Sequence, residues 1–112
     1  MDEKIEMIKA LGDKSRLLIL DMLSCGELCA CKIMDGLNLT QPTVSHHMKI
    51  LQQCELVKGR KEGKWMFYTI NKKKIDELQQ FLTTLTSPKD NCICQGINKD
   101  QKWGDDENEQ CG

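Results

Sequence analysis

Residues 39–51 read LTQPTVSHHMKIL, and this stretch decides how the rest of the chain is interpreted. Thr40 is a good N-cap, because its hydroxyl can accept a hydrogen bond from an unpaired N–H of the first helical turn. Pro42 is tolerated in that turn, where its missing N–H costs little. Val44, Met48 and Leu51 recur at the spacing of one buried helix face. The stretch therefore predicts an amphipathic helix.

The opposite face of this helix carries polar side chains of moderate length and no carboxylate. Such side chains can reach base edges and phosphates in a DNA major groove. An ordinary surface helix usually carries Glu as well as Lys, but no acidic residue occurs between Leu39 and Gln53. We therefore expect this face to contact DNA through Gln41, Thr43, Ser45, His46 and Lys49.

The periodicity on either side of this helix predicts a mainly α fold with a small β-hairpin. Apolar spacing indicates further helices over residues 2–11, from 13 to about 24, from about 27 or 29 to 37, and from 71 to about 86. After Cys54 the period falls to two, and residues 57–61 and 64–70 flank Glu62-Gly63 as the strands of a hairpin do. Two short helices joined by a tight turn and followed by a hairpin are typical of a winged helix-turn-helix.

The net charge of −1 hides a strong asymmetry along the chain. Residues 38–74 hold eight cations and two anions, a net of +6, whereas residues 87–112 hold three cations and six anions, a net of −3. A local positive field favours a nucleic acid as partner even when the overall charge does not. On the hairpin we expect phosphate contacts from Arg60, Lys61 and Lys64, which would position the protein without reading sequence.

A chain of 112 residues is long enough for one small domain. We expect residues 1–86 to form that domain and residues 87–112, which lack apolar periodicity, to form an acidic, flexible tail that carries cysteines. The longest apolar run, Leu17 to Leu20, is too short to span a membrane. The N-terminus also lacks the apolar stretch of a signal peptide, so we expect a cytoplasmic protein.

Apolar faces on the first and last predicted helices suggest a symmetric dimer. The last helix has a 3-4-3 apolar spacing, which suits pairing with another helix. A small domain buries a limited share of its surface, so pairing would stabilise it. We expect the dimer interface to include Ile5, Ile8, Ile75, Leu78, Leu82 and Leu85.

Seven cysteines in a chain without an export signal favour metal-binding or reactive thiols over a disulfide framework. Cys29 and Cys31 stand at the start of the third predicted helix. Two residues apart on a regular α-helix, their side chains would point about 200° away from each other. Binding one ion through both thiolates would therefore unwind or tilt the first turn of the helix that supports the recognition helix. Thiolates suit soft ions such as As(III), Sb(III), Cd(II), Pb(II) or Zn(II).

The remaining ligands of such an ion are open. Trivalent arsenic forms three bonds, and zinc prefers four tetrahedral ligands. Cys25, four residues before Cys29, is one candidate for the third thiolate. Cys92 and Cys94 in the tail are another, and that pair could instead form a second site; an exogenous third ligand is a further alternative. Cys54 ends an apolar helix and is expected to be a small core residue.

Four stretches of the chain, in this order, resemble the ArsR/SmtB family of winged-helix metalloregulatory repressors over about residues 7–86. They read KALGDKSRL at 9–17, GELCAC at 26–31, TQPTVSHH at 40–47 and RKEGKW at 60–65. The resemblance implies a homodimeric repressor that binds operator DNA when metal-free and releases it when metal binds. Residues 27–31 are similar to the arsenic- and antimony-sensing signature of the ArsR branch, which implies As(III) or Sb(III) as inducer and no organic cofactor. Where that signature often has a third cysteine, this chain has Met34, which leaves the third ligand open.

The sequence leaves two other regulatory functions open and argues against an enzyme. A Cd(II), Pb(II) or Zn(II) sensor of the same family commonly adds cysteines from an N-terminal arm, but no Cys precedes Cys25. Family members that sense metal at the final helix use His and carboxylates, and Asp76 and Glu77 have no His beside them. A thiol redox-responsive repressor is the other alternative. Catalytic cysteine usually needs a His base, and both His lie in the predicted recognition helix, so we expect no enzyme.

Overall fold

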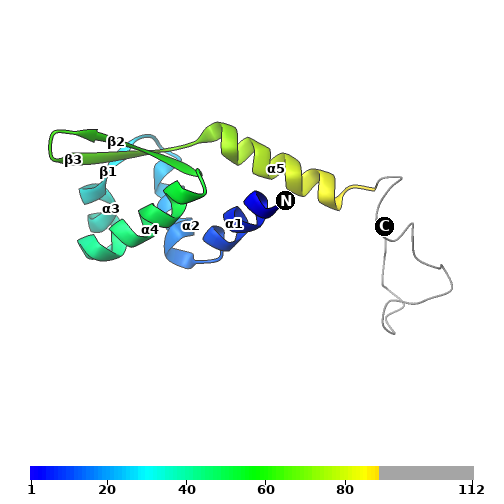
Figure 1. The fold of residues 1–112 in the computed structure, drawn as a ribbon. Helices are drawn as coiled ribbons and strands as arrows, with labels where there is room; N and C mark the ends of the chain where they lie inside the picture. Colours follow the sequence, from blue (N-terminus) through cyan, green and yellow to red (C-terminus); the bar gives the residue numbers. More distant parts are fainter. Residues whose placement is uncertain (89–112) are drawn as a thin grey trace. The chain divides into compact units, whose positions relative to one another are not determined.

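The computed structural model describes residues 1–88 and confirms a mainly α fold with a small β-sheet (Figure 1). Residues Met1–Phe81 form one compact unit, and a second unit begins at Leu82. The predicted tail at residues 87–112 lies almost entirely outside the described residues, so the division at residue 86 stays a prediction. In chain order the elements are α1 (Asp2–Leu11), α2 (Lys14–Leu23), β1 (Leu28–Cys29), α3 (Ala30–Leu37), α4 (Gln41–Gln53), β2 (Val57–Glu62), β3 (Trp65–Ile70) and α5 (Lys72–Thr86).

Helix α4 begins as the sequence predicted. The backbone N–H of Thr43 donates to the Oγ1 atom of Thr40 at 3.4 Å, and Pro42 lies in the first turn. Val44, Met48 and Leu51 are buried, so the predicted apolar face is confirmed. Its polar face is largely exposed within the described residues.

A tight turn joins α3 to α4 and completes the helix-turn-helix. Asn38 adopts the left-handed conformation with φ 55°, which Asn tolerates better than most residues. The backbone N–H of Leu39 donates to the carbonyl oxygen of Met34 at 3.0 Å and closes the end of α3. Figure 1 shows the two helices beside each other below the hairpin, and α3 and α4 are in contact.

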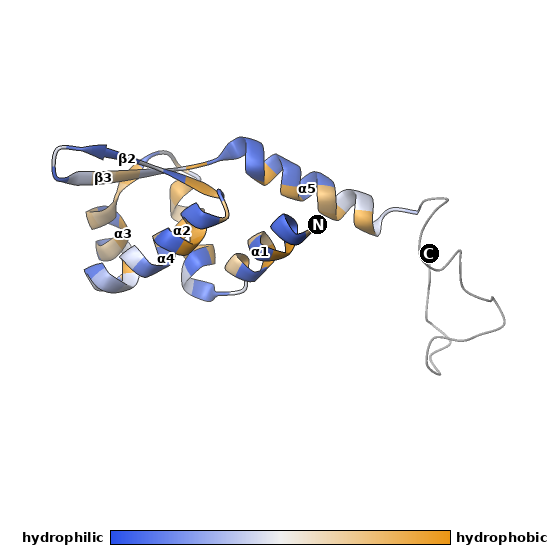
Figure 2. Cartoon of the chain, viewed as in Figure 1, coloured by the Kyte–Doolittle hydropathy of each residue, from blue (hydrophilic) through white to orange (hydrophobic). Residues whose placement is uncertain are grey.

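The predicted hairpin is confirmed and forms part of a three-stranded antiparallel sheet in the order β1-β3-β2. Strands β2 and β3 pair from Val57 opposite Ile70 to Glu62 opposite Trp65, which leaves a two-residue turn. Gly63 opens that turn with φ 62°, a conformation that Gly adopts without steric cost. Most of β2 is hydrophilic in Figure 2, as expected for an outer strand facing solvent.

Strand β1 was not predicted. Leu28 pairs with Tyr68 and Cys29 with Phe67, which makes β3 the central strand. The predicted third helix therefore starts later than expected, at Ala30 rather than at Glu27 or Cys29.

One hydrophobic core holds these elements together. Each of the first four helices contributes at least one side chain that is almost completely buried. Ile33 is the one fully buried residue of α3, and Ala30, Met34 and Leu37 of the same helix pack against the core while partly buried. The largest fully buried side chains are Met7, Ile19, Ile33, Met48, Leu51, Leu56 and Val44.

Candidate functional site

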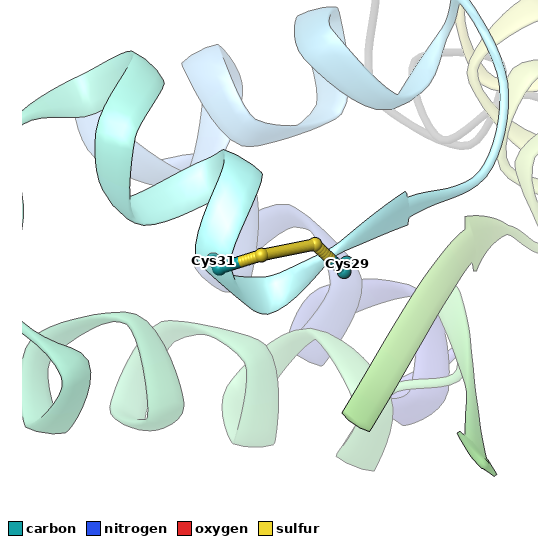
Figure 3. The surroundings of a disulfide bond; sticks show 2 residues. All are labelled: Cys29 and Cys31. Carbon is teal, nitrogen blue, oxygen red and sulfur yellow. A yellow bond between two sulfur atoms is a disulfide. The ribbon is translucent and has the colours of Figure 1, made fainter. Parts of the chain in front are cut away.

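Cys29 and Cys31 lie side by side where β1 ends and α3 begins. Their Cα atoms are 5.4 Å apart, and their Sγ atoms are joined as a disulfide (Figure 3). Cys31 is exposed in the first turn of α3, and Cys29 is half-buried at the end of β1. The structure therefore brings the two thiols together at one point of the surface.

The premise that both thiols lie within a regular helix was wrong, so it no longer supports the expectation that ion binding unwinds or tilts the first turn of α3. Cys29 is not part of the helix but its N-cap, with an extended backbone at φ −81° and ψ 159°. An extended residue directed into the first helical turn lets the two side chains meet while α3 keeps its regular turns from Ala30. The angle of about 200° applies only when both residues are helical.

The structure does not gather a third ligand around this pair. Within residues 1–88, no group of three or more His, Cys, Asp or Glu side chains is arranged to hold a metal ion. Cys25 is a free, exposed thiol, and its predicted role as third ligand stays a prediction. Cys92 and Cys94 lie outside the described residues, so their predicted role stays a prediction.

Cys54 has the structural role that the sequence suggested. It is half-buried at the end of α4, and its Sγ donates to the carbonyl oxygen of Ile50 at 3.4 Å. Burial raises the pKa of this thiol above its usual value. A thiol that resists ionisation is a poor metal ligand, so Cys54 belongs to the packing of α4.

The polar face of α4 presents four of the five predicted DNA-contacting residues to solvent. Gln41, Ser45, His46 and Lys49 are exposed, and Thr43 is half-buried. The Oγ1 atoms of Thr43 and Thr40 lie 2.9 Å apart, so Thr43 also helps to close the first turn of the helix.

His47 is buried, and its contacts were not predicted. Arg16 of α2 donates from Nη1 to the Nδ1 atom of His47 at 3.1 Å and from Nε to the carbonyl oxygen of Ala10 at 2.6 Å. Arginine can only donate, so His47 accepts at Nδ1 and carries its proton on Nε2. Burial is the main cause that lowers the pKa of His47, with the charge of Arg16 acting in the same direction and that of Asp13 opposing it. The contact ties α4 to α2 through a neutral imidazole.

Arg60, predicted to contact phosphate, is held by carboxylates. Its Nη2 and Nε atoms donate to the two carboxylate oxygens of Glu27, at 2.9 Å and 3.1 Å. Glu62 lies 3.4 Å from Nη1, and the guanidinium lies over the ring of Phe67, 4.7 Å from its centroid. The hydrogen bond from Arg60 lowers the pKa of Glu27, and Glu27 in turn raises the pKa of Arg60. No sequence signal linked Glu27 to Arg60, which lies 33 residues further along the chain.

The other predicted cations of the interface are available to a partner. Lys61 and Lys64 are exposed on the hairpin, and Lys49 is exposed on α4. None of the three forms an ion pair within the described residues, and Lys64 lies over the ring of Trp65, 5.7 Å from its centroid. The exposed positive charge therefore spans α4 and the hairpin.

A cavity of about 330 Å³ lies between α3, α4 and β3 and connects the two predicted sites. Cys31 and Met34 line it from α3, Gln41 and Ser45 from α4, and Lys64 from the turn of the hairpin. Cys31 of the thiol pair thus borders the same cavity as side chains of the polar face of α4.

The predicted dimer residues divide into two groups. Ile5 and Ile8 on α1 are exposed, as are Leu82 and Leu85 on α5. Leu78 is only 4% exposed and belongs to the core of its own chain, which contradicts its predicted place in the interface. Ile75 is half-buried against the same core. The apolar spacing of α5 thus serves its own domain at Leu78 and leaves leucines exposed closer to its C-terminal end.

None of the helices in the described part of the chain combines the length and the apolar character that a membrane span requires.

Comparisons with known proteins place this architecture in a family. Residues 13–58 match the family described as "Bacterial regulatory protein, arsR family". The "Arsenical resistance operon repressor" of Staphylococcus aureus is 44% identical over 91 residues, which are 81% of this chain and 88% of that protein. The "Cadmium resistance transcriptional regulatory protein CadC homolog" of Staphylococcus aureus is 35% identical over 74 residues, 65% of this chain and 61% of that protein.

A solved structure supports the same assignment. The homodimeric winged helix-turn-helix DNA-binding domain Mb0332 from Mycobacterium bovis, determined by solution NMR, superposes with a TM-score of 0.64 at 28% identity. The match covers 75% of this chain and 78% of that one. The chain belongs to the arsR family of bacterial regulatory proteins and has their winged helix-turn-helix fold.

Proposed function

We propose that this chain is a homodimeric repressor that binds operator DNA and releases it when As(III) or Sb(III) binds the thiolates of Cys29 and Cys31. The observation that carries the proposal is the position of this thiol pair, at the junction of β1 and α3 and on the cavity that α4 also lines. The arsenical resistance repressor that is 44% identical supports the same inducer class. The function is regulatory and not enzymatic. Since the proposed partner is operator DNA, we expect the protein in the cytoplasm.

DNA binding is proposed to use α4 and the hairpin in different ways. The exposed polar side chains Gln41, Ser45 and His46 of α4 have the length and donor–acceptor character that base edges require. The exposed cations Lys49, Lys61 and Lys64 would bind phosphates, which fixes the register of the protein on the duplex. A dimer would place two copies of α4 in successive major grooves.

The chemistry of the thiol pair fits a trivalent metalloid. Arsenous acid can exchange two of its hydroxyl groups for the two sulfurs, with each thiol proton leaving in a molecule of water. The third valence would keep a hydroxide or take another thiolate, and we propose Cys92 or Cys94 of the tail for that position. A tetrahedral Zn(II) site would need two ligands more than the pair provides.

Ligand binding is proposed to act on DNA binding through the elements that carry the thiols. Cys31 belongs to α3, which continues through the tight turn into α4, and Cys29 belongs to β1, which pairs with the hairpin strand β3. A ligand that holds both sulfurs therefore fixes the angle between α3 and the sheet. By linkage, the ligand must bind the DNA-incompetent state more tightly, and DNA must weaken ligand binding by the same factor.

The decisive experiment measures arsenite-dependent release from DNA. A fluorescein-labelled duplex, selected from a randomised library by the reduced wild-type chain, is titrated with protein in the presence and absence of sodium arsenite. Cys29→Ser and Cys31→Ser should each abolish the response. Cys54→Ser and Cys25→Ser are matched thiol controls and should respond like the wild type. If the Cys29→Ser and Cys31→Ser variants still release DNA at the wild-type arsenite concentration, the site is wrong.

One structural observation favours redox sensing as a second candidate function. Cys29 and Cys31 are joined as a disulfide, so hydrogen peroxide could oxidise the two thiols to this disulfide and itself be reduced to two molecules of water. Release by peroxide or diamide under arsenite-free conditions would support this function. The relative named for cadmium resistance keeps Cd(II) as a further inducer to compare in the same assay. Release by arsenite in an oxygen-free, reduced sample would favour the first proposal.

The dimer is proposed to form through the exposed apolar side chains of α1 and α5. Leu82→Glu should convert the dimer into a monomer, because a carboxylate cannot be buried without a large desolvation cost. Leu18→Glu on α2 is the matched control, since Leu18 and Leu82 are 40% and 42% exposed. Light scattering after size-exclusion chromatography distinguishes the two masses. A dimer that survives Leu82→Glu would place the interface elsewhere.

A further inference from the structure

The three-stranded sheet places the thiol pair in register with the arginine of the hairpin. Cys29 is opposite Phe67, and Phe67 is opposite Arg60 on its other side. Directly opposed residues of antiparallel strands carry their side chains on the same face of the sheet. Cys29, Phe67 and Arg60 therefore form one row across β1, β3 and β2. The guanidinium of Arg60 lies 4.7 Å from the centroid of the Phe67 ring, so this part of the row is in contact.

Glu27 links the two ends of this row. It stands two residues before Cys29, in the segment that leads into β1, and its two carboxylate oxygens accept from Nη2 and Nε of Arg60 at 2.9 Å and 3.1 Å. Two parallel hydrogen bonds fix the relative orientation of two groups, which a single ion pair does not. The pair therefore joins the segment that carries the thiols to the outer strand of the hairpin.

The surroundings of Arg60 do not fit a phosphate contact. Glu27 occupies two of its nitrogen atoms, and Glu62 lies 3.4 Å from the third. A phosphate would have to displace a bidentate carboxylate and would meet a second one beside it. Lys61 and Lys64, in contrast, are exposed without an ion pair in the described residues. Arg60 thus differs from Lys61 and Lys64 because its guanidinium nitrogen atoms already face carboxylates.

We propose that Glu27 and Arg60 are positioning residues that transmit ligand binding at Cys29 and Cys31 to the hairpin, by clamping the segment before β1 against β2. This proposal rests on the function proposed above. A ligand that moves Cys29 moves Glu27 with it, and the bidentate pair carries that displacement to β2. Without the clamp, the thiols still bind the ligand, but the hairpin is no longer displaced with them.

The test measures the coupling between ligand and DNA rather than either affinity alone. The dissociation constant for the selected duplex is determined with and without sodium arsenite under reducing conditions, and the ratio of the two is the response. Glu27→Gln should lower the response to about one-fifth of the wild-type ratio or less, within the usual range of allosteric couplings. Arsenite affinity without DNA, followed by near-ultraviolet absorption of the thiolate complex, should change less than about twofold.

Two further variants separate the clamp from simpler roles. Arg60→Gln should lower the response as much as Glu27→Gln, and the double variant should lower it no further, because both changes remove one shared interaction. Glu62→Gln is the matched control and should respond like the wild type, since Glu62 and Arg60 lie on the same strand.

The possible failures are distinguishable. A wild-type chain whose DNA affinity does not change with arsenite overturns the proposed function itself. A normal wild-type response that Glu27→Gln leaves intact overturns the clamp alone. The clamp is also overturned if Glu27→Gln tightens DNA binding while Arg60→Gln weakens it, because that pattern identifies Arg60 as a phosphate contact released from its carboxylate.

Discussion

The salt dependence of DNA binding tests directly which cations of the proposed interface face phosphates. Lys49 on α4 and Lys61 and Lys64 on the hairpin are exposed and form no ion pair within residues 1–88, whereas Arg60 is held by Glu27. Three cations per protomer make six in a dimer, and a slope of about −0.9 for each neutralised phosphate predicts about −5 for log K against log salt. If Arg60 also bound phosphate, eight contacts would give about −7.

These slopes are far enough apart to measure. Raising potassium chloride threefold, from about 0.1 to about 0.3 M, should weaken binding about 400-fold for six contacts and about 3,000-fold for eight. Fluorescence anisotropy with the selected duplex gives the dissociation constant at each salt concentration. Lys64→Ala should flatten the slope by about 2, because each protomer loses one contact, and should weaken binding to all sequences alike.

Lys9→Ala is the control for the loss of one lysine from each protomer, since Lys9 lies on α1 in an ion pair with Glu6. The slope should be the same in this variant and in the wild type. A wild-type slope flatter than about −2, or no change in Lys64→Ala, would refute the phosphate contacts of the hairpin. A slope near −7 that falls by about 2 in Arg60→Gln would assign Arg60 to the DNA and remove the basis for the clamp.

Further predictions concern stability and sequence reading. Ile33→Ala should lower the free energy of unfolding by about 2–5 kcal/mol in urea denaturation, because Ile33 is completely buried in the core. A loss below about 1 kcal/mol would contradict this. The pKa of His47 is lowered in the folded chain, so the unfolded chain binds more protons at this residue. The stability that neutral His47 contributes is therefore present above about pH 6.5, the usual pKa of histidine. It is lost as the pH falls through that value toward the folded pKa. The Tm of the wild type should therefore fall more steeply between about pH 7.5 and 5 than that of His47→Gln, and parallel curves would contradict the assignment. Ser45→Ala should cost about 1–3 kcal/mol on the selected duplex and leave binding to random duplex unchanged, whereas equal losses on both would exclude base reading.

Features that depend on neighbours in the sequence could be predicted, and α4 is the clearest case. Its N-cap, the proline of its first turn and its apolar face all lie within thirteen residues, and each was confirmed. The hairpin was likewise evident from a change of period around Gly63. In both cases the pattern that predicts the element is contained in the element itself.

Features that depend on distant partners could not be predicted. β1 has two residues and exists only through its pairing with β3, so Cys29 was assigned to a helix. That error led to the expectation that ion binding would unwind or tilt the first turn of α3. Apolar spacing alone also could not show that Leu78 packs in its own core while Leu82 is exposed. The sign of a charge is visible in the sequence, but the carboxylate that holds Arg60 is 33 residues away.

The tight turn between α3 and α4 determines how small a movement of α3 is enough to displace α4. Asn38 adopts the left-handed conformation and Thr40 caps the next helix, so the connection is short and ordered. We therefore expect α3 and α4 to move together as a rigid pair. Helix α3 has 8 residues and α4 has 13, so they are about 12 and 20 Å long at 1.5 Å per residue. A rotation of the pair by about 5° at α3 would move the far end of α4 by about 2 Å. This is several times the range of roughly 0.5 Å within which the donor–acceptor distance of a hydrogen bond to a base must stay. Under the proposed function, a single bound metalloid atom that rotates α3 by this amount would therefore misalign α4 with its DNA site in each protomer.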